Sequence, residues 1–578
     1  MNSTPAFTSS GDTPLLSVAD SLNDPRYYLV NFDNVLTWVS ERYDDLLNED
    51  ERDFIIRFQT LPVPSKALLV RMVMRKGEHF RIDRLVYDEI GETRAALAPL
   101  VEHALVDAHP DLTLDQLFDL FTRDELVGMF RDHLERPRDR KVLLKEALVK
   151  EALVPAFDKP LGTDEWRALA GQPLASDVVR LTDMAVCERL RLMFFGNLRQ
   201  QFSEFVLADQ GIYRFELVPF TVESRAFQRR EDIERYWQIH DCRERFDAGH
   251  DIDEVLAALP SRFDDSLWLE ARRGRVIYAI ARHCERQGEL VRAAGLYAHS
   301  GHSEARIRRI RVLERLGEHE QALALCTAAS ETPTSEAERQ QAMRIQPRLH
   351  RALGMEKPSI EAPAPVRRCD LTLPRSGCVE HAVREHLASP EAPVFYVENT
   401  LINALFGLLC WEAIFAPLPG AFFHPFQSGP ADLMRPEFYL QREQHFKRCL
   451  ARLEEGKWRE TILQRYREKQ GIQSPFVHWG ALDEELLALA LECLPPAHLR
   501  GWFERLLTDI RANRAGMPDL IRFYPHAPEG TPRYEMIEVK GPGDRLQDNQ
   551  KRWIAFCARH GMPVMVCHVR WGDDGDRA

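Results

Sequence analysis

The sequence lacks the features that mark secreted, membrane and zinc-binding proteins. Its 11 cysteines are scattered, without a CxxC pair or zinc-ligand spacing, which predicts reduced thiols and no zinc finger. The longest apolar run, Leu401 to Trp411, contains Asn403 and is too short to cross a bilayer. Residues 1–5 lack the basic region and apolar core of a secretory signal. We therefore expect a soluble intracellular protein with no membrane partner.

The sequence also lacks an excess of positive charge. It has 76 Lys and Arg but 89 Asp and Glu, which gives a formal net charge of −13. This balance argues against a protein coated in basic surface and is the strongest compositional argument against nucleic-acid binding. A local basic groove would still permit such binding, and an acidic remainder helps solubility. At 578 residues the chain is long enough for several domains with their own cores.

Two short strand-like runs near the C-terminus carry two acids and a lysine. Leu520 to Tyr524 and Tyr534 to Val539 have strand character, and the Pro- and Gly-containing stretch 525–532 predicts a turn between them. The simplest arrangement is an antiparallel hairpin. Because strand side chains alternate between faces, Glu538 and Lys540 point the same way. Asp519, at the start of the partner strand, can then lie beside them.

Two carboxylates and a lysine in this arrangement suit metal-dependent phosphodiester hydrolysis. Mg²⁺ takes oxygen ligands and is usually held by one or two carboxylates together with substrate phosphate. The bound metal activates water, and a neighbouring lysine can position that water or neutralise the transition state. The alternative is a surface hairpin with ordinary charged residues, because Asp and Lys are common.

The flanking sequence favours the catalytic interpretation. Leu546 to Arg559 has apolar residues at helical spacing, and Val564 to Val569 predicts a further buried strand. The motif Pro518-Asp519 … Glu538-Val539-Lys540 resembles that of the PD-(D/E)XK nucleases, whose core has the order hairpin, helix, strand. The longer run from Gly516 to Trp553 resembles the virus-type replication-repair nuclease (VRR-NUC) domain.

This resemblance implies a set of site residues. Asp519 and Glu538 would hold Mg²⁺ or Mn²⁺, with the Val539 carbonyl as a further ligand, and Lys540 would orient the attacking water. In the family a Gln of the helix after the lysine supports the metal site, and Gln550 matches it. Gln550 as a solvated helix residue is the alternative.

The family also uses a glutamate from an upstream helix, and Val394 to Phe415 is the candidate. The segment is apolar almost all round, which predicts burial, and a buried acid needs a partner or a metal. The resemblance places this ligand at Glu398, in the first turn of the predicted helix. Glu412 competes but lies at the far end, and Glu398 could instead be a helix-start residue favoured by the helix dipole.

The N-terminal block from Tyr27 to Tyr43, leading into Leu68 to Gly77, resembles the entry region of the Fanconi-anaemia-associated nuclease family, which ends in a VRR-NUC domain. The family resemblance implies a structure-specific DNA nuclease with endonuclease and 5′–3′ exonuclease activity near 5′ flaps and nicks, acting in interstrand-crosslink repair. Its partner would be flapped, nicked or branched duplex DNA. A cytoplasmic, nucleoid-associated location follows, and a monomer is favoured.

Residues 113–148 predict two short amphipathic helices and a basic stretch, which resemble a SAP-type pair that grips duplex backbone. A solvated charged surface is the alternative, because acidic residues are interleaved. Phosphate contacts would come from Arg131, Arg136, Arg138, Arg140, Lys141 and Lys145.

A weak internal repeat pairs the run from Gly288 with the run from Gly317 and predicts stacked, TPR-like helical hairpins. Several arginines lie between the two copies and cover more than one helix face. Some must therefore meet acids within the protein, and others could face a phosphate. The candidates for DNA contact are Arg306, Arg308, Arg309 and Arg311.

Together these features predict a multidomain, mainly α protein with a C-terminal α/β nuclease core of restriction-endonuclease-like fold. The expected domains are 1–105 (helical), 106–160 (SAP-like), 161–353 (helical, TPR-like), a linker at 354–375, and the nuclease domain 376–578 with a helical insertion at about 430–514. Two other functions stay open: a Holliday-junction resolvase or restriction-like nuclease, and a non-catalytic helical-repeat scaffold. The intact Asp519, Glu538 and Lys540 argue against the scaffold.

Overall fold

A computed structural model describes residues 24–130, 141, 160–170, 174–200, 213–358 and 364–572. The chain forms two compact units, residues 1–213 and 214–578. The predicted domain 161–353 is therefore divided between them. The reason is strand β3 (Val178–Leu181), which pairs with two strands of the N-terminal region.

The first unit is built from helices around a small antiparallel sheet of order β1-β3-β2. Its strands are β1 (His79–Arg81), β2 (Val106–Asp107) and β3, and its main helices are α2 (Tyr27–Tyr43), α3 (Glu49–Thr60), α4 (Val63–Val73), α5 (Thr93–Glu102) and α10 (Met184–Phe195), with 3₁₀ turns at Asp44–Leu46 and Ile82–Arg84.

The predicted SAP-like helix pair is present as α6 (Leu114–Leu120) and α7 (Arg123–Met129). Each begins with a reciprocal capping box, in which Thr113 pairs with Gln116 and Thr122 with Glu125. Helix α9 (Thr163–Ala170) adds Trp166 to their apolar cluster.

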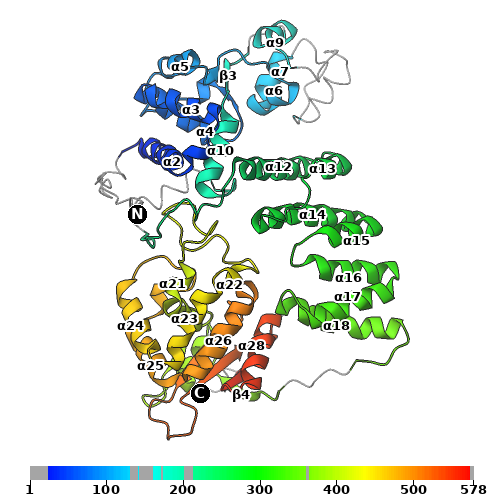
Figure 1. The fold of residues 1–578 in the computed structure, drawn as a ribbon, viewed down its shortest axis with the longest axis vertical. Helices are drawn as coiled ribbons and strands as arrows, with labels where there is room; N and C mark the ends of the chain where they lie inside the picture. The colour runs from blue at the N-terminus through cyan, green and yellow to red at the C-terminus, as the bar shows by residue number, and fades with distance from the viewer. Residues whose placement is uncertain are drawn as a thin grey trace, which may run out of the picture. The chain divides into compact units, whose positions relative to one another are not determined.

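The second unit begins with stacked helical hairpins, shown in green in Figure 1. The helices are α12 (Arg230–Asp247), α13 (Ile252–Ala258), α14 (Leu267–Gln287), α15 (Leu290–His299), α16 (Ala305–Leu316), α17 (His319–Glu331) and α18 (Glu336–Ala352). The repeat seen in the sequence is confirmed: Gly288 ends α14 and Gly317 ends α16, both with positive φ (85° and 81°), and each turn leads directly into the next helix.

The C-terminal part of this unit contains a five-stranded sheet of order β4-β8-β7-β6-β5. The strands β4, β8 and β7 run parallel, and β7, β6 and β5 run antiparallel. Their bounds are β4 (Arg367–Leu373), β5 (Val394–Tyr396), β6 (Leu520–Phe523), β7 (Tyr534–Lys540) and β8 (Val564–Trp571).

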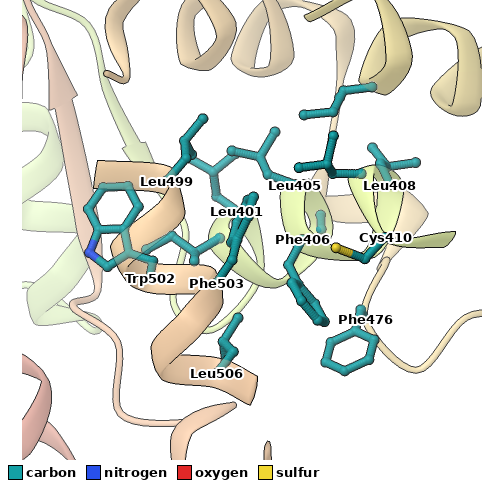
Figure 2. Close-up of a cluster of buried hydrophobic side chains, with 14 of the residues drawn as sticks. Leu401, Leu405, Phe406, Leu408, Cys410, Phe476, Leu499, Trp502, Phe503 and Leu506 are labelled. Atoms are coloured by element: carbon teal, nitrogen blue, oxygen red, sulfur yellow. The ribbon is translucent and has the colours of Figure 1, made fainter. Parts of the chain in front are cut away.

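Helices cover both faces of this sheet. One face packs on α19 (Val379–Leu387) through an apolar cluster that includes Val383, Ile537 and Val539. The other face joins a large core with α20 (Leu401–Leu409), α26 (Pro496–Thr508) and α28 (Asp548–Arg559). Figure 2 shows α20 and α26 interlocking in that core through residues such as Phe406 and Phe503.

The remaining helices lie between the site segments. They are α21 (Trp411–Ile414), α22 (Phe438–Gln441), α23 (Glu443–Glu454), α24 (Trp458–Glu468), α25 (Glu484–Cys493) and α27 (Ile510–Asn513), with a 3₁₀ turn at Trp479–Ala481. All except α21 fall, together with α26, within the predicted insertion at about 430–514. No helix among the described residues is long and apolar enough to cross a membrane.

Two element predictions were wrong. The predicted helix Val394 to Phe415 begins only at Leu401, because the β-branched and aromatic residues Val394–Tyr396 instead pair with β6 as the edge strand β5. The predicted linker 354–375 contains β4, which pairs along its whole length with β8. In both cases long-range strand pairing decides the local structure.

Candidate active site

Strands β6 and β7 form the predicted hairpin, with Leu520 opposite Ile537. Along β7, Tyr534 and Met536 belong to the core shared with α26 and α28, so the alternation places Glu538 and Lys540 on that same face. Asp519 precedes β6, and its Oδ2 accepts a hydrogen bond of 2.8 Å from the Val539 N–H. The structure therefore brings Asp519, Glu538 and Lys540 together, as the sequence predicted.

Glu538 is fully buried and forms an ion pair with Lys540, whose Nζ lies 2.7 Å from Oε1. That approach lacks hydrogen-bond geometry, so among the described residues neither oxygen of Glu538 accepts a hydrogen bond. A buried carboxylate in this condition is rare and costs free energy unless another group satisfies it. The unsatisfied oxygens fit a hard cation.

The protonation of the two carboxyl groups reflects their burial. The pKa of Glu538 is raised to about 7, chiefly by burial and also by the nearby Asp519, while Lys540 opposes the rise. Burial likewise raises the pKa of Asp519 to about 6, against its hydrogen bond from Val539 and the charge of Lys540. Such a pair of raised acids is characteristic of a site that gains stability when a cation binds.

Glu398 lies in the turn between β5 and α20, half-buried, rather than in the first turn of a helix. Its carboxylate accepts hydrogen bonds from the Tyr396 hydroxyl and from Asn399 Nδ2 at 3.2 Å. Its charge contributes to the raised pKa of both Asp519 and Glu538, so it faces the same site. The competing Glu412 is exposed and pairs with Arg452 and Arg465 instead.

Asn399 is a site residue that the sequence reasoning missed. It has a left-handed φ of 53°, a conformation that Asn tolerates better than most residues. Its Oδ1 accepts from the Met517 N–H at 3.1 Å, two residues before Asp519, while its Nδ2 donates to Glu398. Asn399 therefore ties the upstream glutamate to the strand that carries Asp519.

Gln550 lies in the first turn of α28, where its Oε1 accepts from the Gln547 N–H at 2.8 Å and caps the helix. The neighbouring Asn549 packs against Gly516. A Cβ on Gly516 would lie 2.7 Å from the Asn549 side chain, and its φ of 91° favours glycine. This close approach brings the first turn of α28 against the segment that leads into Asp519.

The residues present fit a divalent cation held mainly by oxygen. Within the described ranges no three His, Cys, Asp or Glu side chains are already gathered as a metal cage. Mg²⁺ does not require one, because it retains several waters and is held by one or two carboxylates. Asp519, Glu538 and the Val539 carbonyl provide that minimum, and the charge of Glu398 acts on both carboxyl groups.

The predicted DNA-binding residues are only partly visible. Lys141 is described, and its Nζ donates to the carbonyls of Phe118 (2.7 Å) and Phe121 (2.5 Å), so its ammonium stabilises the end of α6. Its DNA contact stays a prediction. The other five of the SAP-like set lie outside the described residues: Arg131, Arg136, Arg138, Arg140 and Lys145.

Most of the arginines of α16 bind acidic or amide side chains within the protein. Their spacing over more than one helix face predicted this for some of them. Arg306 binds the buried Glu338 through two hydrogen bonds of 2.6 and 2.7 Å. Arg308 lies 3.6 Å from Glu285, and Arg311 donates to Gln341 at 2.9 Å. For Arg309 no such ion pair is found among the described residues.

A second basic group, not found from the sequence, lies between the helical hairpins and the nuclease core. Burial and the guanidinium groups of Arg511 and Arg275 lower the pKa of His302, against the charge of Glu304. Burial, together with the charge of Arg275, also lowers the pKa of the half-buried Arg435. These residues come from four separate segments, so no local pattern could reveal them.

Comparison with known proteins agrees with this architecture. Family models match at residues 26–107 ("FAN1, HTH domain"), 111–160 ("Fanconi anemia-associated nuclease SAP domain") and 453–571 ("VRR-NUC domain"). The Fanconi-associated nuclease 1 homolog of Pseudomonas aeruginosa is 53% identical over 97% of this chain and 99% of its own length. The human Fanconi-associated nuclease 1 is 23% identical, over 94% of this chain and 62% of its own length.

Solved structures agree as well. The crystal structure of paFAN1 bound to 5′ flap DNA with a 2-nucleotide flap and a gap is similar with a TM-score of 0.82 and 53% identity, over 96% of this chain and 99% of that one. Fold and site define a metal-dependent DNA nuclease with a VRR-NUC domain of the PD-(D/E)XK type. The chain belongs to the Fanconi-associated nuclease 1 family.

Proposed function

We propose that this nuclease cuts DNA near 5′ flaps and nicks, as an endonuclease and as a 5′–3′ exonuclease, in the repair of interstrand crosslinks. Support comes from paFAN1, whose structures contain 5′ flap DNA with a gap, and from the similarity of the two chains over nearly their full lengths. Because its substrate is DNA, we expect the enzyme to work in the cytoplasm at the nucleoid.

The proposed cofactor is Mg²⁺ or Mn²⁺, held by Asp519, Glu538 and the Val539 carbonyl, with Glu398 as a further ligand. The observation that carries this assignment is the fully buried Glu538 carboxylate, which accepts no hydrogen bond from the described residues. When bound, the cation makes water a better nucleophile and offsets the negative charge that develops on the phosphate.

The chain's own groups perform the remaining tasks. Asp519 is fixed by the Val539 N–H, so one of its oxygens keeps its orientation when the carboxyl ionises. Lys540, which is nearly buried, orients the attacking water and stabilises negative charge at the scissile phosphate. In this proposal Gln550 supports the site from the first turn of α28.

The basic group around His302 gives the nuclease core a neighbouring phosphate contact. Arg511 is exposed, and among the described residues no acid pairs with it. It lies on α27, eight residues before Asp519, and is close enough to His302 to lower its pKa. A DNA backbone held there would lie next to the catalytic strands.

The test is cleavage of an end-labelled 5′-flap duplex with Mn²⁺, Mg²⁺ or EDTA. Asp519→Ala is the inactive variant, and Glu529→Ala is the matched control, because Glu529 is exposed in the turn of the same hairpin. We expect metal-dependent cutting near the junction by the wild type and by Glu529→Ala, and none by Asp519→Ala.

Other outcomes identify the alternatives. Cutting of a four-way junction in preference to flaps would indicate a junction resolvase. Binding to flap, nick and junction without any cutting would indicate a scaffold and would overturn the proposal.

A further inference from the structure

Helix α18, the last helix of the repeat, carries a polar stripe that faces the nuclease core. Glu336, Gln340 and Arg344 lie four residues apart and so share one helix face. Figure 1 shows α18 beside α28 and α26. These two helices pack on the sheet face that bears Asp519 and Glu538.

The stripe holds the first turn of α28. Arg344 donates from both terminal nitrogens to the carboxylate of Asp548, at 2.5 and 2.6 Å. Gln340 donates to the Asp548 carbonyl at 3.4 Å and accepts from Arg552 at 2.6 Å. The start of α28 is thus held by side-chain contacts at two successive turns.

Glu336, at the start of α18, contacts a second helix of the nuclease core, α26. It accepts two hydrogen bonds of 2.6 and 2.8 Å from Arg505 of α26. The Arg505 guanidinium is buried and lies over the rings of Trp553 and Phe556 of α28, 4.8 and 4.6 Å from their centres. A residue of the repeat therefore neutralises a buried cation of the nuclease core.

The turn that α18 holds is connected to both site strands. Asp548 begins α28 eight residues after Lys540, and Asn549 packs against Gly516, three residues before Asp519. Movement of this turn would displace the two segments that position Lys540 and Asp519. Displacements of this kind matter, because catalysis depends on sub-ångström placement of the reacting groups.

We propose that α18 is a positioning element of the nuclease site: through Arg344 and Asp548 it fixes the first turn of α28, and with it Lys540 and Asp519. This inference rests on the proposed function. The Arg344–Asp548 pair is about half exposed (47% and 48%), so it contributes little to folding. Its effect is expected on the catalytic rate and on cation binding rather than on stability.

The chain offers a matched control on the same helix. Arg348, one turn further along α18, makes an equivalent two-nitrogen contact with Glu314 of α16, at 3.0 and 2.9 Å, which does not reach the nuclease core. Removal of either arginine costs α18 one partly exposed ion pair. Only the removal of Arg344 should disturb the site.

The experiment measures flap cleavage and Mn²⁺ binding without DNA for Arg344→Ala, Arg344→Gln, Asp548→Asn, the double variant Arg344→Ala/Asp548→Asn, and Arg348→Ala. For each Arg344 or Asp548 variant we expect kcat to fall about fivefold or more. The KM for flap DNA should stay unchanged, and the half-saturating Mn²⁺ concentration should rise. The double variant should be no worse than the worse single one, because both lose the same pair. Arg348→Ala should match the wild type.

The inference is overturned if Arg344→Ala and Arg344→Gln behave like Arg348→Ala, or if the losses of the two single variants multiply in the double variant. Melting curves at the assay pH show whether each variant is folded at the assay temperature. A wild type that does not cut would contradict the proposed function instead, so the two failures are distinguishable.

Discussion

At the scale of single residues, the buried pair Glu538 and Lys540 determines the energetics of the site. A carboxyl group with a raised pKa lowers the stability of the folded state once the pH exceeds its value in the unfolded chain. For Glu538 this loss develops between pH 4.5, the ordinary pKa of a glutamate, and about 7, its pKa in the folded protein. Above that pH range the whole loss of folding stability remains until a cation binds.

Replacement of this acid by its neutral analogue should therefore stabilise the metal-free protein. We expect Glu538→Gln at pH 8 in EDTA to be more stable than the wild type by roughly 1–3 kcal/mol, with no gain at pH 4. Thermal denaturation at both pH values measures this. Added Mn²⁺ should raise the melting temperature of the wild type but not of the variant.

Glu535→Gln is the control for this prediction. Glu535 lies on the same strand and is also buried, but unlike Glu538 it accepts a hydrogen bond, from Arg367 at 2.9 Å, so its loss should not stabilise the protein. A Glu538→Gln variant that melts below the wild type at pH 8 in EDTA would contradict the unsatisfied-carboxylate account.

Protons and the cation should also compete for the same oxygens. The raised pKa values of Glu538 (about 7) and Asp519 (about 6) imply that the half-saturating Mn²⁺ concentration rises as the pH falls below 7 and more steeply below 6. Isothermal titration with Mn²⁺ at pH 5.5, 6.5 and 8 tests this. Equal affinity at the three pH values would show that these two groups are not the ligands.

At the scale of elements, the first turn of α28 and the approach to β6 depend on Gly516. A side chain there would meet Asn549 and would also require the left-handed φ of 91°. We expect Gly516→Ala to lower stability by more than the roughly 1 kcal/mol of backbone strain, and to reduce cleavage as well.

Gly543, in the loop after Lys540, is the matched control. It has nearly the same φ of 89°, but a Cβ there would meet nothing within 4 Å. Gly543→Ala should therefore lose only the stability that corresponds to backbone strain. Equal urea-denaturation midpoints for the two variants would contradict the role assigned to the Gly516 contact.

The elements also show what the sequence could predict. The β6–β7 hairpin, α28 and β8 follow from local signals: alternation, a Pro- and Gly-rich turn, and helical spacing. The strands β4 and β5 do not, because each is defined by pairing with a strand more than 100 residues away. Asn399 was missed for the same reason, since its role depends on contact with Met517.

At the scale of the whole molecule, the acidic chain must present its positive charge locally to hold DNA. Arg511 and Arg306 allow an exposed arginine to be compared with one that pairs with a buried acid. Arg511 is exposed and has no acid partner among the residues that the structure describes, whereas Arg306 is bound to the buried Glu338. We therefore expect a phosphate contact from Arg511 rather than from Arg306.

We expect Arg511→Ala to weaken flap DNA binding and to reduce the slope of log affinity against log salt by about 1, with no change in melting temperature. Arg306→Ala should do the reverse, because it leaves Glu338 buried without its cationic partner and so lowers stability. Fluorescence anisotropy at several salt concentrations, beside melting curves, separates the two. Loss of DNA affinity in Arg306→Ala alone would contradict this division.

The most direct test of the site assignment is an anomalous difference map from a crystal of this protein soaked in Mn²⁺. The account predicts a peak at coordination distance from carboxylate oxygens of both Asp519 and Glu538 and from the Val539 carbonyl, and no such peak in Asp519→Ala. A map with no peak between Asp519 and Glu538, or with one only elsewhere in the molecule, would contradict it.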